Sequence, residues 1–355
     1  MTTVVSQEAQ AVHEAACIID LHADTPKLIS RGYDLRRRHR TPWPVRRWLG
    51  HVDLPRLQEG GVAAQFFGMW TFPKPERGCN AEVHRQLDAL TRAISAGEGI
   101  ALCSTAEEIR RCRARGMVAA LCGIEGGQAL EAGGYASEAA TLEQLKKFAE
   151  RKVRYLGLLH FSRNALGAPA MGWGMDPAQG LTPLGCAVVD ACRELGMLVD
   201  LAHINRRGFF DAVSRRPGPL LVSHTGVAGV HRHWRNIDDE QIRAVADSGG
   251  VVGVIFAPRY LGRGGVEGVV DHLMHIIRVA GEDAVALGSD WDGFVQPPQG
   301  LADPSELPHL TEALLRRRLS AQTIHKLLGG NVLRMLDEVG PLRLRPLSCD
   351  GTAAT

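Results

Sequence analysis

Eight short, continuously apolar stretches, separated by helix-like segments, constrain the fold of this chain more than any other feature. Apolar residues that run without alternation are typical of strands buried on both faces, as in parallel sheets. Eight repeats of strand and helix favour a closed parallel barrel, because an open sheet need not stop at eight strands. We predict strands at residues 17–23, 62–69, 117–124, 153–160, 197–203, 220–224, 251–256 and 284–290.

The intervening segments carry helix signals. Asp53 precedes a proline-containing first turn that ends at a glycine, and Thr105 or Ser104 is a candidate cap for a following helix. Residues 162–180 are rich in glycine, alanine and methionine without periodicity, which predicts a long loop of the kind that covers active sites. We predict helices at residues 6–16, 53–61, 80–97, from 105 onward, 142–151, 183–195, 238–248, 266–280, 308–317, 320–328 and 331–338.

The length of 355 residues fits one (β/α)8 barrel with insertions, which commonly needs about 250 residues for the barrel itself. Hydrophobic residues make up 45% of the chain and charged residues 23%, as in globular proteins with a substantial core. We therefore predict an α/β fold: a single TIM-barrel domain over residues 1–355, with long loops on its C-terminal face. The barrel core spans about 17–340, and residues 341–355 form a loosely held tail.

Composition narrows the functional classes. A formal charge of +2 gives no argument for nucleic acid or an anionic membrane, and no apolar run reaches 18 residues. The segment 31–48 holds seven arginines, but its shortness favours a solvated, specialised loop over a nucleic-acid site. No signal peptide is visible, and eight scattered cysteines without a Cys-x-x-Cys pair indicate reduced thiols. We expect a cytoplasmic enzyme.

Polar side chains follow the predicted strands where each one ends. In a parallel barrel these C-terminal ends open onto one face, so the side chains should converge there. Each has an ordinary explanation by itself: His203 as a core histidine, Asp290 as a loop cap, Glu125 as the partner of an arginine. A carboxylate ending an apolar strand is costly to bury unless it is paired or bound to metal. Together they predict a metal site made from His22, Asp24, Glu125, His160, His203, His224 and Asp290.

The chemistry of these groups suggests two metal ions. A carboxylate can bridge two cations with its two oxygens and an imidazole cannot, which makes Glu125 the natural bridge. His22 and Asp24 would hold one ion, and His203 and His224 the other. Two metals about 3.5 Å apart lower the pKa of a bridging water and polarise a carbonyl, which is the chemistry of amide or ester hydrolysis.

From about Ile18 to Val339 the chain resembles the membrane dipeptidases (renal dipeptidase, peptidase family M19), binuclear zinc barrels of the amidohydrolase type. The resemblance is carried by several motifs in order. They are 20–26 (DLHADTP), 63–67 (AAQFF), 124–127 (IEGG), 153–156 (VRYL) leading to His160, 180–185 (GLTPLG), 199–203 (VDLAH), 223–224 (SH), 235–236 (RN), 288–293 (GSDWDG) and 329–331 (GGN).

The resemblance implies two Zn²⁺ per chain, bridged by Glu125 and a water or hydroxide. One ion takes His22, Asp24 and Glu125, and the other takes Glu125, His203 and His224. His160 is expected to stabilise the oxyanion, and Asp290 to handle the proton and the substrate's free amine. Arg235 and Tyr260 are expected to contact the substrate's C-terminal carboxylate. The implied activity is that of a metallo-dipeptidase acting on dipeptides with a free amine and carboxylate, including L-D dipeptides.

Several positions depart from the family pattern. Gln128 stands where members often carry histidine, Ala23 where animal members carry asparagine, and Tyr260 follows a loop without the usual asparagines. The missing signal suggests a bacterial cytoplasmic relative, and a homodimer is a family-level expectation. Two alternatives stay open: a binuclear hydrolase of another amide or ester, such as an N-acyl amino acid, a lactone or a β-lactam-like ring, and a barrel that binds without catalysis.

Overall fold

Eight parallel strands close into a barrel in the order β1-β2-β4-β5-β6-β7-β8-β9, with β9 pairing back to β1. The computed structural model describes residues 4–42, 44–72, 78–131, 137–215 and 218–344. Every residue of these strands is buried, as expected for a parallel barrel covered by helices. The strands are β1 (Ile18–Ala23), β2 (Val62–Trp70), β4 (Val118–Glu125), β5 (Val153–Gly157), β6 (Leu198–Asp200), β7 (Leu221–Thr225), β8 (Val251–Val254) and β9 (Val285–Leu287). The predicted TIM-barrel fold is confirmed.

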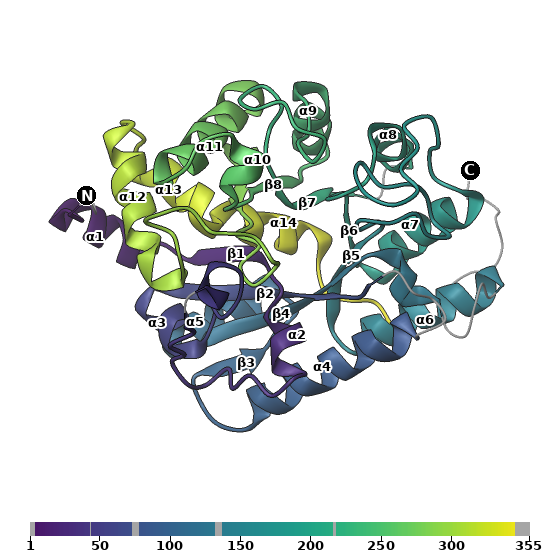
Figure 1. The fold of residues 1–355 in the computed structure, drawn as a ribbon, viewed down its shortest axis with the longest axis horizontal. Coiled ribbons are helices and arrows are strands. Elements are labelled where there is room, and N and C mark those ends of the chain that lie inside the picture. The colour runs from purple at the N-terminus through teal and green to yellow at the C-terminus, as the bar shows by residue number, and fades with distance from the viewer. Residues whose placement is uncertain (1–3, 43, 73–77, 132–136, 216–217, 345–355) are drawn as a thin grey trace.

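Helices surround these strands, with α4 and α6 on one side of the barrel and α9 and α11 on the opposite side (Figure 1). The described helices are α1 (Gln7–Ala15), α2 (Thr25–Ile29), α3 (Leu54–Glu59), α4 (Cys79–Ser95), α5 (Ala106–Ala114), α6 (Glu138–Glu150), α7 (Pro183–Leu195), α8 (Arg206–Ser214), α9 (Asp239–Asp247), α10 (Pro258–Leu261), α11 (Val266–Ala280), α12 (Leu307–Arg316), α13 (Ala321–His325) and α14 (Asn331–Val339). Short 3₁₀ turns lie at Val45–Arg47, Gly127–Leu130, Glu282–Ala284 and Pro304–Glu306.

Some elements were not predicted. A ninth strand, β3 (Ile100–Leu102), pairs with the start of β4, and its three residues are too few to stand out as an apolar run. The short helices α2 and α10 each have a proline in the first turn, and α8 contains a glycine and is capped by Asn205. The helices predicted at 320–328 and 331–338 are separated by a kink at Gly329, whose backbone is not helical (φ 170°, ψ −15°).

Four of the predicted strands end earlier than expected: β8 stops at Val254 instead of residue 256, and the other three end before a site residue. β5 stops at Gly157, β6 at Asp200 and β9 at Leu287, so His160, His203 and Asp290 lie in the turns that follow. His203 and Asp290 have left-handed backbones, with φ of 66° and 62°, and a strand cannot contain such residues. The three site residues therefore occupy the loops on the C-terminal face, where active sites of this fold form.

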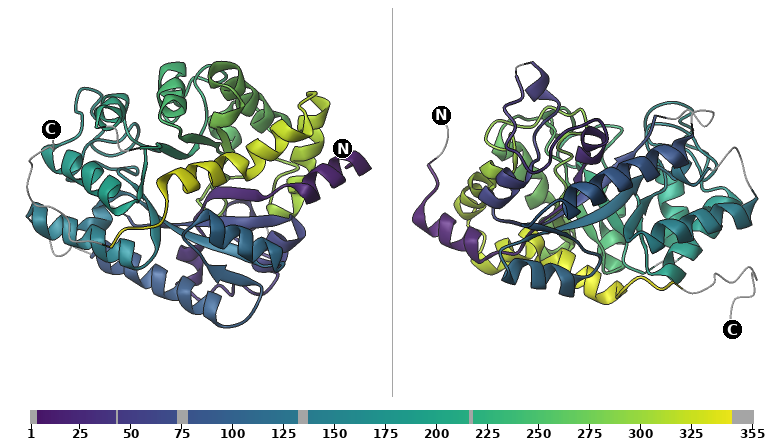
Figure 2. Two further views of the ribbon diagram at one scale, coloured as in Figure 1. Left: turned by 180° about the vertical axis from the view of Figure 1, so that it is seen from behind. Right: turned by 90° about the horizontal axis from the view of Figure 1, so that it is seen from below.

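The barrel interior is packed with side chains. One core cluster takes residues from all eight barrel strands, such as Leu21, Phe66 and Tyr155, and adds Met335 and its neighbours from α14. Figure 2 (left) shows α14 crossing the strands on the side hidden in Figure 1. This helix seals one end of the barrel, which leaves the other end for chemistry.

Other predictions have mixed outcomes. The seven described cysteines are all free, as expected. In the predicted tail, Arg343 donates its backbone N–H to the Leu195 carbonyl, so the described part is attached to the barrel; the rest lies outside the described residues. Within the described ranges, no helix combines the length and apolarity needed to cross a bilayer.

Candidate metal centre

The seven side chains predicted for the metal site come together at the C-terminal ends of the strands. All are nearly excluded from solvent; the least buried is His160, with a side chain 14% exposed. In three overlapping groups, potential ligand atoms lie within 4.8 Å of one another: His22 with His224 and Asp290, Glu125 with His160 and His203, and His22 with Asp24 and Glu125.

Glu125 lies at the centre of this arrangement, at the end of β4. Its Oε1 is 2.8 Å from Nε2 of His203 and 3.3 Å from Nε2 of His224. The same oxygen is 3.8 Å from Nε2 of His22, and Oε2 is 3.4 Å from Nε2 of His160. One carboxylate thus faces four imidazoles, and both of its oxygens lie within reach of potential metal ligands.

His22 and Asp24 leave β1 on the same side of the chain. His22 Nε2 lies 3.2 Å from Asp24 Oδ1 and 3.9 Å from Asp290 Oδ1. Among the described residues, His22 Nε2, Asp24 Oδ1 and Glu125 Oε2 are fully buried without a hydrogen-bond partner. Unpaired buried polar atoms are costly, and three of them around one point fit the donor set of a divalent cation.

The pKa values of the carboxyl groups in the site also indicate a cation site. Burial, followed by the charge of Asp24, raises the pKa of both Glu125 and Asp290 well above the usual carboxyl values. Burial also raises the pKa of Asp24, with Asp292 adding to the effect. Three crowded carboxyls in a dry site are unfavourable as anions unless positive charge is supplied. A cation bound between them would supply it.

Three of the imidazoles, those of His160, His203 and His224, are held in the neutral form, which is the form that binds metals. Burial lowers the pKa of His160 to about 3, and it lowers the pKa values of His203 and His224 well below the ordinary value. Nε2 of His203 and Nε2 of His224 lie 3.0 Å apart. Both atoms also face Glu125, so a shared cation would relieve this crowding of electron-rich atoms.

Two hydroxyl groups behind the site set the histidine tautomers. Tyr155 Oη lies 2.7 Å from His22 Nδ1 and can donate its own proton to the Leu21 carbonyl at 3.4 Å. Ser223 Oγ donates to Asp200 at 2.6 Å and lies 2.9 Å from His224 Nδ1. In both cases the proton belongs on Nδ1, which leaves Nε2 free to bind a metal.

Sequence reasoning assigned no role to Tyr155, Ser223 or Asp200. Ser223 is adjacent to His224, a weak signal that was present in the sequence. Tyr155 gave no signal, because it reads as one more apolar strand residue. A comparable pair braces β1, where Asp20 accepts hydrogen bonds from the backbone N–H and the hydroxyl of Ser289 at 2.7 and 2.6 Å.

Two glycines make room for this arrangement. A Cβ at Gly68 of β2 would lie 2.5 Å from His22 Cε1 and 3.0 Å from Asp24 Oδ1. A Cβ at Gly123 of β4 would lie 2.0 Å from the Tyr155 ring. Any side chain at these positions would displace the ligands or the residue that orients them.

Arg235 and Tyr260, the predicted carboxylate contacts, follow β7 and β8. Arg235 is buried and donates from Nη2 to the His224 carbonyl at 2.6 Å. Burial lowers its pKa, while Tyr260, Asp290 and Glu125 act to raise it, so the guanidinium faces the metal-site carboxylates. The Tyr260 ring is nearly buried and packs edge-on against His233, with ring centroids 4.9 Å apart.

The loop after β9 has an unusual backbone. Asp290, Asp292 and Phe294 all adopt left-handed conformations, with φ of 62°, 67° and 57°. The conformation is held by the Asp292 carboxylate, which accepts hydrogen bonds from the Thr25 hydroxyl at 2.8 Å and from the His51 backbone N–H at 2.7 Å. Such strain is concentrated at functional sites because the surrounding contacts must maintain it.

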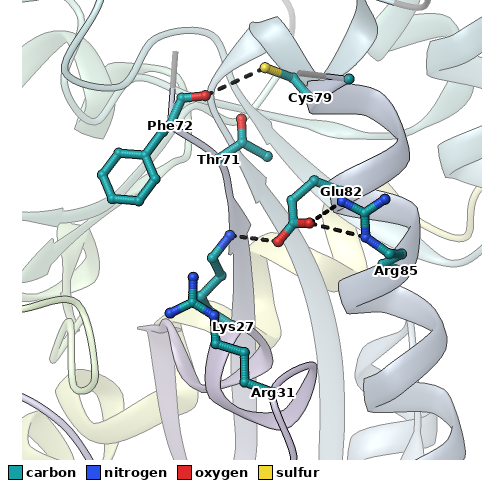
Figure 3. A pocket seen from close by; sticks show the side chains of 8 residues that line it. Lys27, Arg31, Thr71, Phe72, Cys79, Glu82 and Arg85 are labelled. Carbon is teal, nitrogen blue, oxygen red and sulfur yellow. Dashed lines mark hydrogen bonds and ion pairs between the residues drawn. The ribbon is translucent and has the colours of Figure 1, made fainter. Parts of the chain in front are cut away.

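A separate pocket of about 560 Å³ opens between α2, α4 and the end of β2 (Figure 3). Lys27 reaches across it, with Nζ 2.6 Å from Oε1 of Glu82, and Arg85 pairs with the other oxygen of Glu82 (Figure 3). None of the seven metal-site side chains lines this pocket.

Comparison with known proteins agrees with the geometry. Residues 6–345 match the family model described as membrane dipeptidase (peptidase family M19). Over 334 residues the chain is 31% identical to the dipeptidase tcpJ of Claviceps purpurea (strain 20.1), covering 90% of this chain and 76% of that protein.

Solved structures extend this similarity. A metallo peptidase from Rhodobacter sphaeroides, liganded with a phosphinate mimic of the dipeptide L-Ala-D-Ala, is 28% identical with a TM-score of 0.75, covering 92% of this chain and 99% of its own. The probable dipeptidase PvdM of Pseudomonas aeruginosa shares the fold with a TM-score of 0.82 at 21% identity, covering 94% and 98%. The chain therefore belongs to the membrane dipeptidase family, peptidase family M19, and is a metallo-dipeptidase.

Proposed function

We propose that this protein hydrolyses dipeptides that have a free amine and a free C-terminal carboxylate, and that it uses two zinc ions per chain. The observation that carries the proposal is the convergence of four histidines and three carboxyls around buried, unpartnered ligand atoms. His22, Asp24 and Glu125 would hold one ion, and Glu125, His203 and His224 the other. When bound, the ions would lower the pKa of a water molecule and polarise the scissile carbonyl.

The remaining residues of the site handle the proton and the charges of the substrate. Asp290 is beside His22 in a dry site, and the buried carboxyl suits transfer of a proton to the leaving amine. Its negative charge also suits the free amine of the substrate. His160 is neutral and lies beside Glu125, so it is placed to donate a hydrogen bond to the developing oxyanion.

Arg235 and Tyr260 supply recognition of the C-terminal carboxylate. A planar guanidinium can bind a carboxylate with two parallel hydrogen bonds, which gives both affinity and orientation. The enclosure of Arg235 strengthens such a bond, because the local dielectric constant is low.

We further propose that L-D dipeptides are accepted. The support is the related Rhodobacter sphaeroides enzyme, whose structure holds a mimic of L-Ala-D-Ala. A homodimer stays a prediction of the family resemblance.

The test is hydrolysis of L-D and L-L dipeptides alongside their C-terminal amides by the zinc-loaded enzyme. Free dipeptides should be hydrolysed and the amides poorly. If the enzyme hydrolyses only N-acyl amino acids, lactones or β-lactam-like rings, the dipeptide assignment is wrong, and the protein is a hydrolase of another amide or ester.

Replacing Arg235→Ala tests the carboxylate contact. We expect KM for free dipeptides to rise about 10- to 100-fold, since a hydrogen bond to a charged group contributes about 1.5–3 kcal/mol. The amides should change little, and the zinc content should stay at the wild-type value. Arg232→Ala, at an exposed arginine of the same segment, is the matched control. Equal losses on dipeptides and amides would remove Arg235 from carboxylate recognition.

A further inference from the structure

Three aromatic residues, Trp70, Phe72 and Phe294, form a connected group that we call the aromatic wall. The Trp70 and Phe72 rings meet edge-on with centroids 5.0 Å apart, and Trp70 meets Phe294 edge-on at 5.9 Å. Trp70 is 6% exposed, whereas Phe72 is 61% and Phe294 48% exposed. A buried tryptophan thus contacts two phenylalanines that remain largely exposed.

The wall adjoins the metal centre. The Trp70 ring lies 5.9 Å from the ring of His160, and Trp70 is the register partner of Glu125 in the barrel sheet. Lys27 also contacts the indole of Trp70 through a cation–π interaction, with Nζ 5.2 Å from the ring centroid. Lys27 is in turn held by Glu82, as Figure 3 shows. The wall therefore has a defined position beside the proposed oxyanion donor.

The order of the strands places the wall across the barrel from the carboxylate site. Trp70 ends β2, and Arg235 follows β7; in the closed ring of eight strands these two are separated by three strands in either direction. A dipeptide whose carboxylate binds Arg235 and whose peptide bond lies at the metal centre extends its N-terminal residue away from β7. That residue is then placed on the side of the barrel where β9 and β2 end, which is the side of the wall.

Folding does not explain Phe294. Its φ of 57° lies in the left-handed region, which is unfavourable for a bulky side chain, although Asp and Asn tolerate it through their short polar side chains. Nearly half of the ring is exposed, so little burial offsets the backbone strain. The strained backbone and the exposed side chain together suggest a functional role for Phe294.

We propose that the aromatic wall binds the side chain of the dipeptide's N-terminal residue and selects large apolar side chains. This inference rests on the proposed dipeptidase function. An open aromatic surface favours aromatic and branched aliphatic groups, and it offers nothing to glycine.

The experiment compares kcat/KM for Phe-Ala and Gly-Ala in zinc-loaded wild type and in Phe294→Asn. Asparagine tolerates the left-handed backbone, so the variant should fold with an unchanged or higher Tm. Wild type should prefer Phe-Ala, and the variant should lose about tenfold of that preference, mainly through KM for Phe-Ala. Phe210→Asn is the control, since it makes the same change on α8, where the Phe210 ring contacts Phe209 and Arg206.

Each outcome decides the proposal. A Phe-Ala to Gly-Ala ratio that is the same in wild type and Phe294→Asn would overturn it, as would a wild type without preference. A ratio that falls equally in Phe210→Asn would also overturn it, because the effect would not be specific to the wall. If wild type hydrolyses neither dipeptide, the proposed dipeptidase function is wrong, and the proposed role of the aromatic wall is wrong with it.

Discussion

At the scale of single residues, the candidate site depends on groups that touch no substrate. Tyr155 and Ser223 place protons on the Nδ1 atoms of two histidines and so present both Nε2 atoms to one point. Mutation of residues that orient metal ligands in this way typically lowers metal affinity or activity about 10- to 100-fold. Of the two residues, Tyr155 gives the clearer test, because its hydroxyl can be removed while its ring is kept.

Tyr155→Phe removes the hydroxyl and leaves the packing of the ring over Gly123. We expect the affinity for zinc to fall about 10- to 100-fold, because His22 loses the partner that fixes its tautomer. Competition with a chromogenic chelator measures this affinity. Tyr33→Phe is a matched control, since it removes a hydroxyl that bonds to the Val52 carbonyl. Unchanged zinc affinity in Tyr155→Phe would show that the hydroxyl does not orient the ligand.

At the scale of elements, α11 is coupled to the loops on the C-terminal face through one buried histidine. His272 accepts the Val227 backbone N–H at its Nδ1, 2.8 Å away, and its Nε2 lies 3.1 Å from the Leu261 carbonyl. The neutral ring satisfies both partners, whereas a proton on Nδ1 would oppose the Val227 N–H. This helix therefore fastens the segments that follow β7 and β8, which carry Arg235 and Tyr260.

Low pH should weaken the hydrogen bonds of His272 and so destabilise the protein. Burial is the main cause that lowers the pKa of His272 to about 4. The positive charges of His231 and His275 lower this pKa further, whereas the hydrogen bond to Leu261 and the charge of Asp271 raise it. Because the pKa in the folded state lies below the ordinary 6.5, the unfolded state binds more protons as the pH falls from about 6.5 to 4. The histidine's contribution to stability is complete above this window and is lost within it, by about 2 kcal/mol at a pH of about 5.

Urea unfolding of wild type and His272→Gln, near pH 7 and near pH 5, measures this effect. The free energy of unfolding should fall less with pH in the variant than in wild type, by about 2 kcal/mol. His309→Gln, at a half-buried histidine of α12, should keep the wild-type pH dependence. Parallel pH profiles for wild type and His272→Gln would contradict the assigned role.

At the scale of the whole molecule, the barrel could be predicted from sequence because its strands are mostly apolar runs without alternation. The site residues were visible for the same reason: His22, Glu125 and His224 interrupt or end such runs. Strand lengths were less predictable. The left-handed backbone at His203 and Asp290, which ends β6 and β9 early, arises from loop contacts that sequence does not reveal.

Residues that act through long-range contacts escaped prediction. Tyr155 meets His22 only because barrel closure brings together residues 133 positions apart. Trp70 and Phe294 read as a strand end and a loop residue, and nothing in their local sequence indicates that their rings meet. Pairing between distant loops depends on the strand order, which the apolar pattern does not specify.

The central claim is that Glu125 joins two metal ions at the end of the barrel. The most direct measurement is the zinc content of the purified wild type, of Glu125→Gln and of Glu131→Gln, whose buried glutamate lies outside the proposed ligand set. We predict about two zinc ions per chain in wild type and Glu131→Gln, and loss of both from Glu125→Gln, since a bridging carboxylate serves both ions. A metal-free wild type, or a Glu125→Gln variant with its full zinc content, would contradict the account.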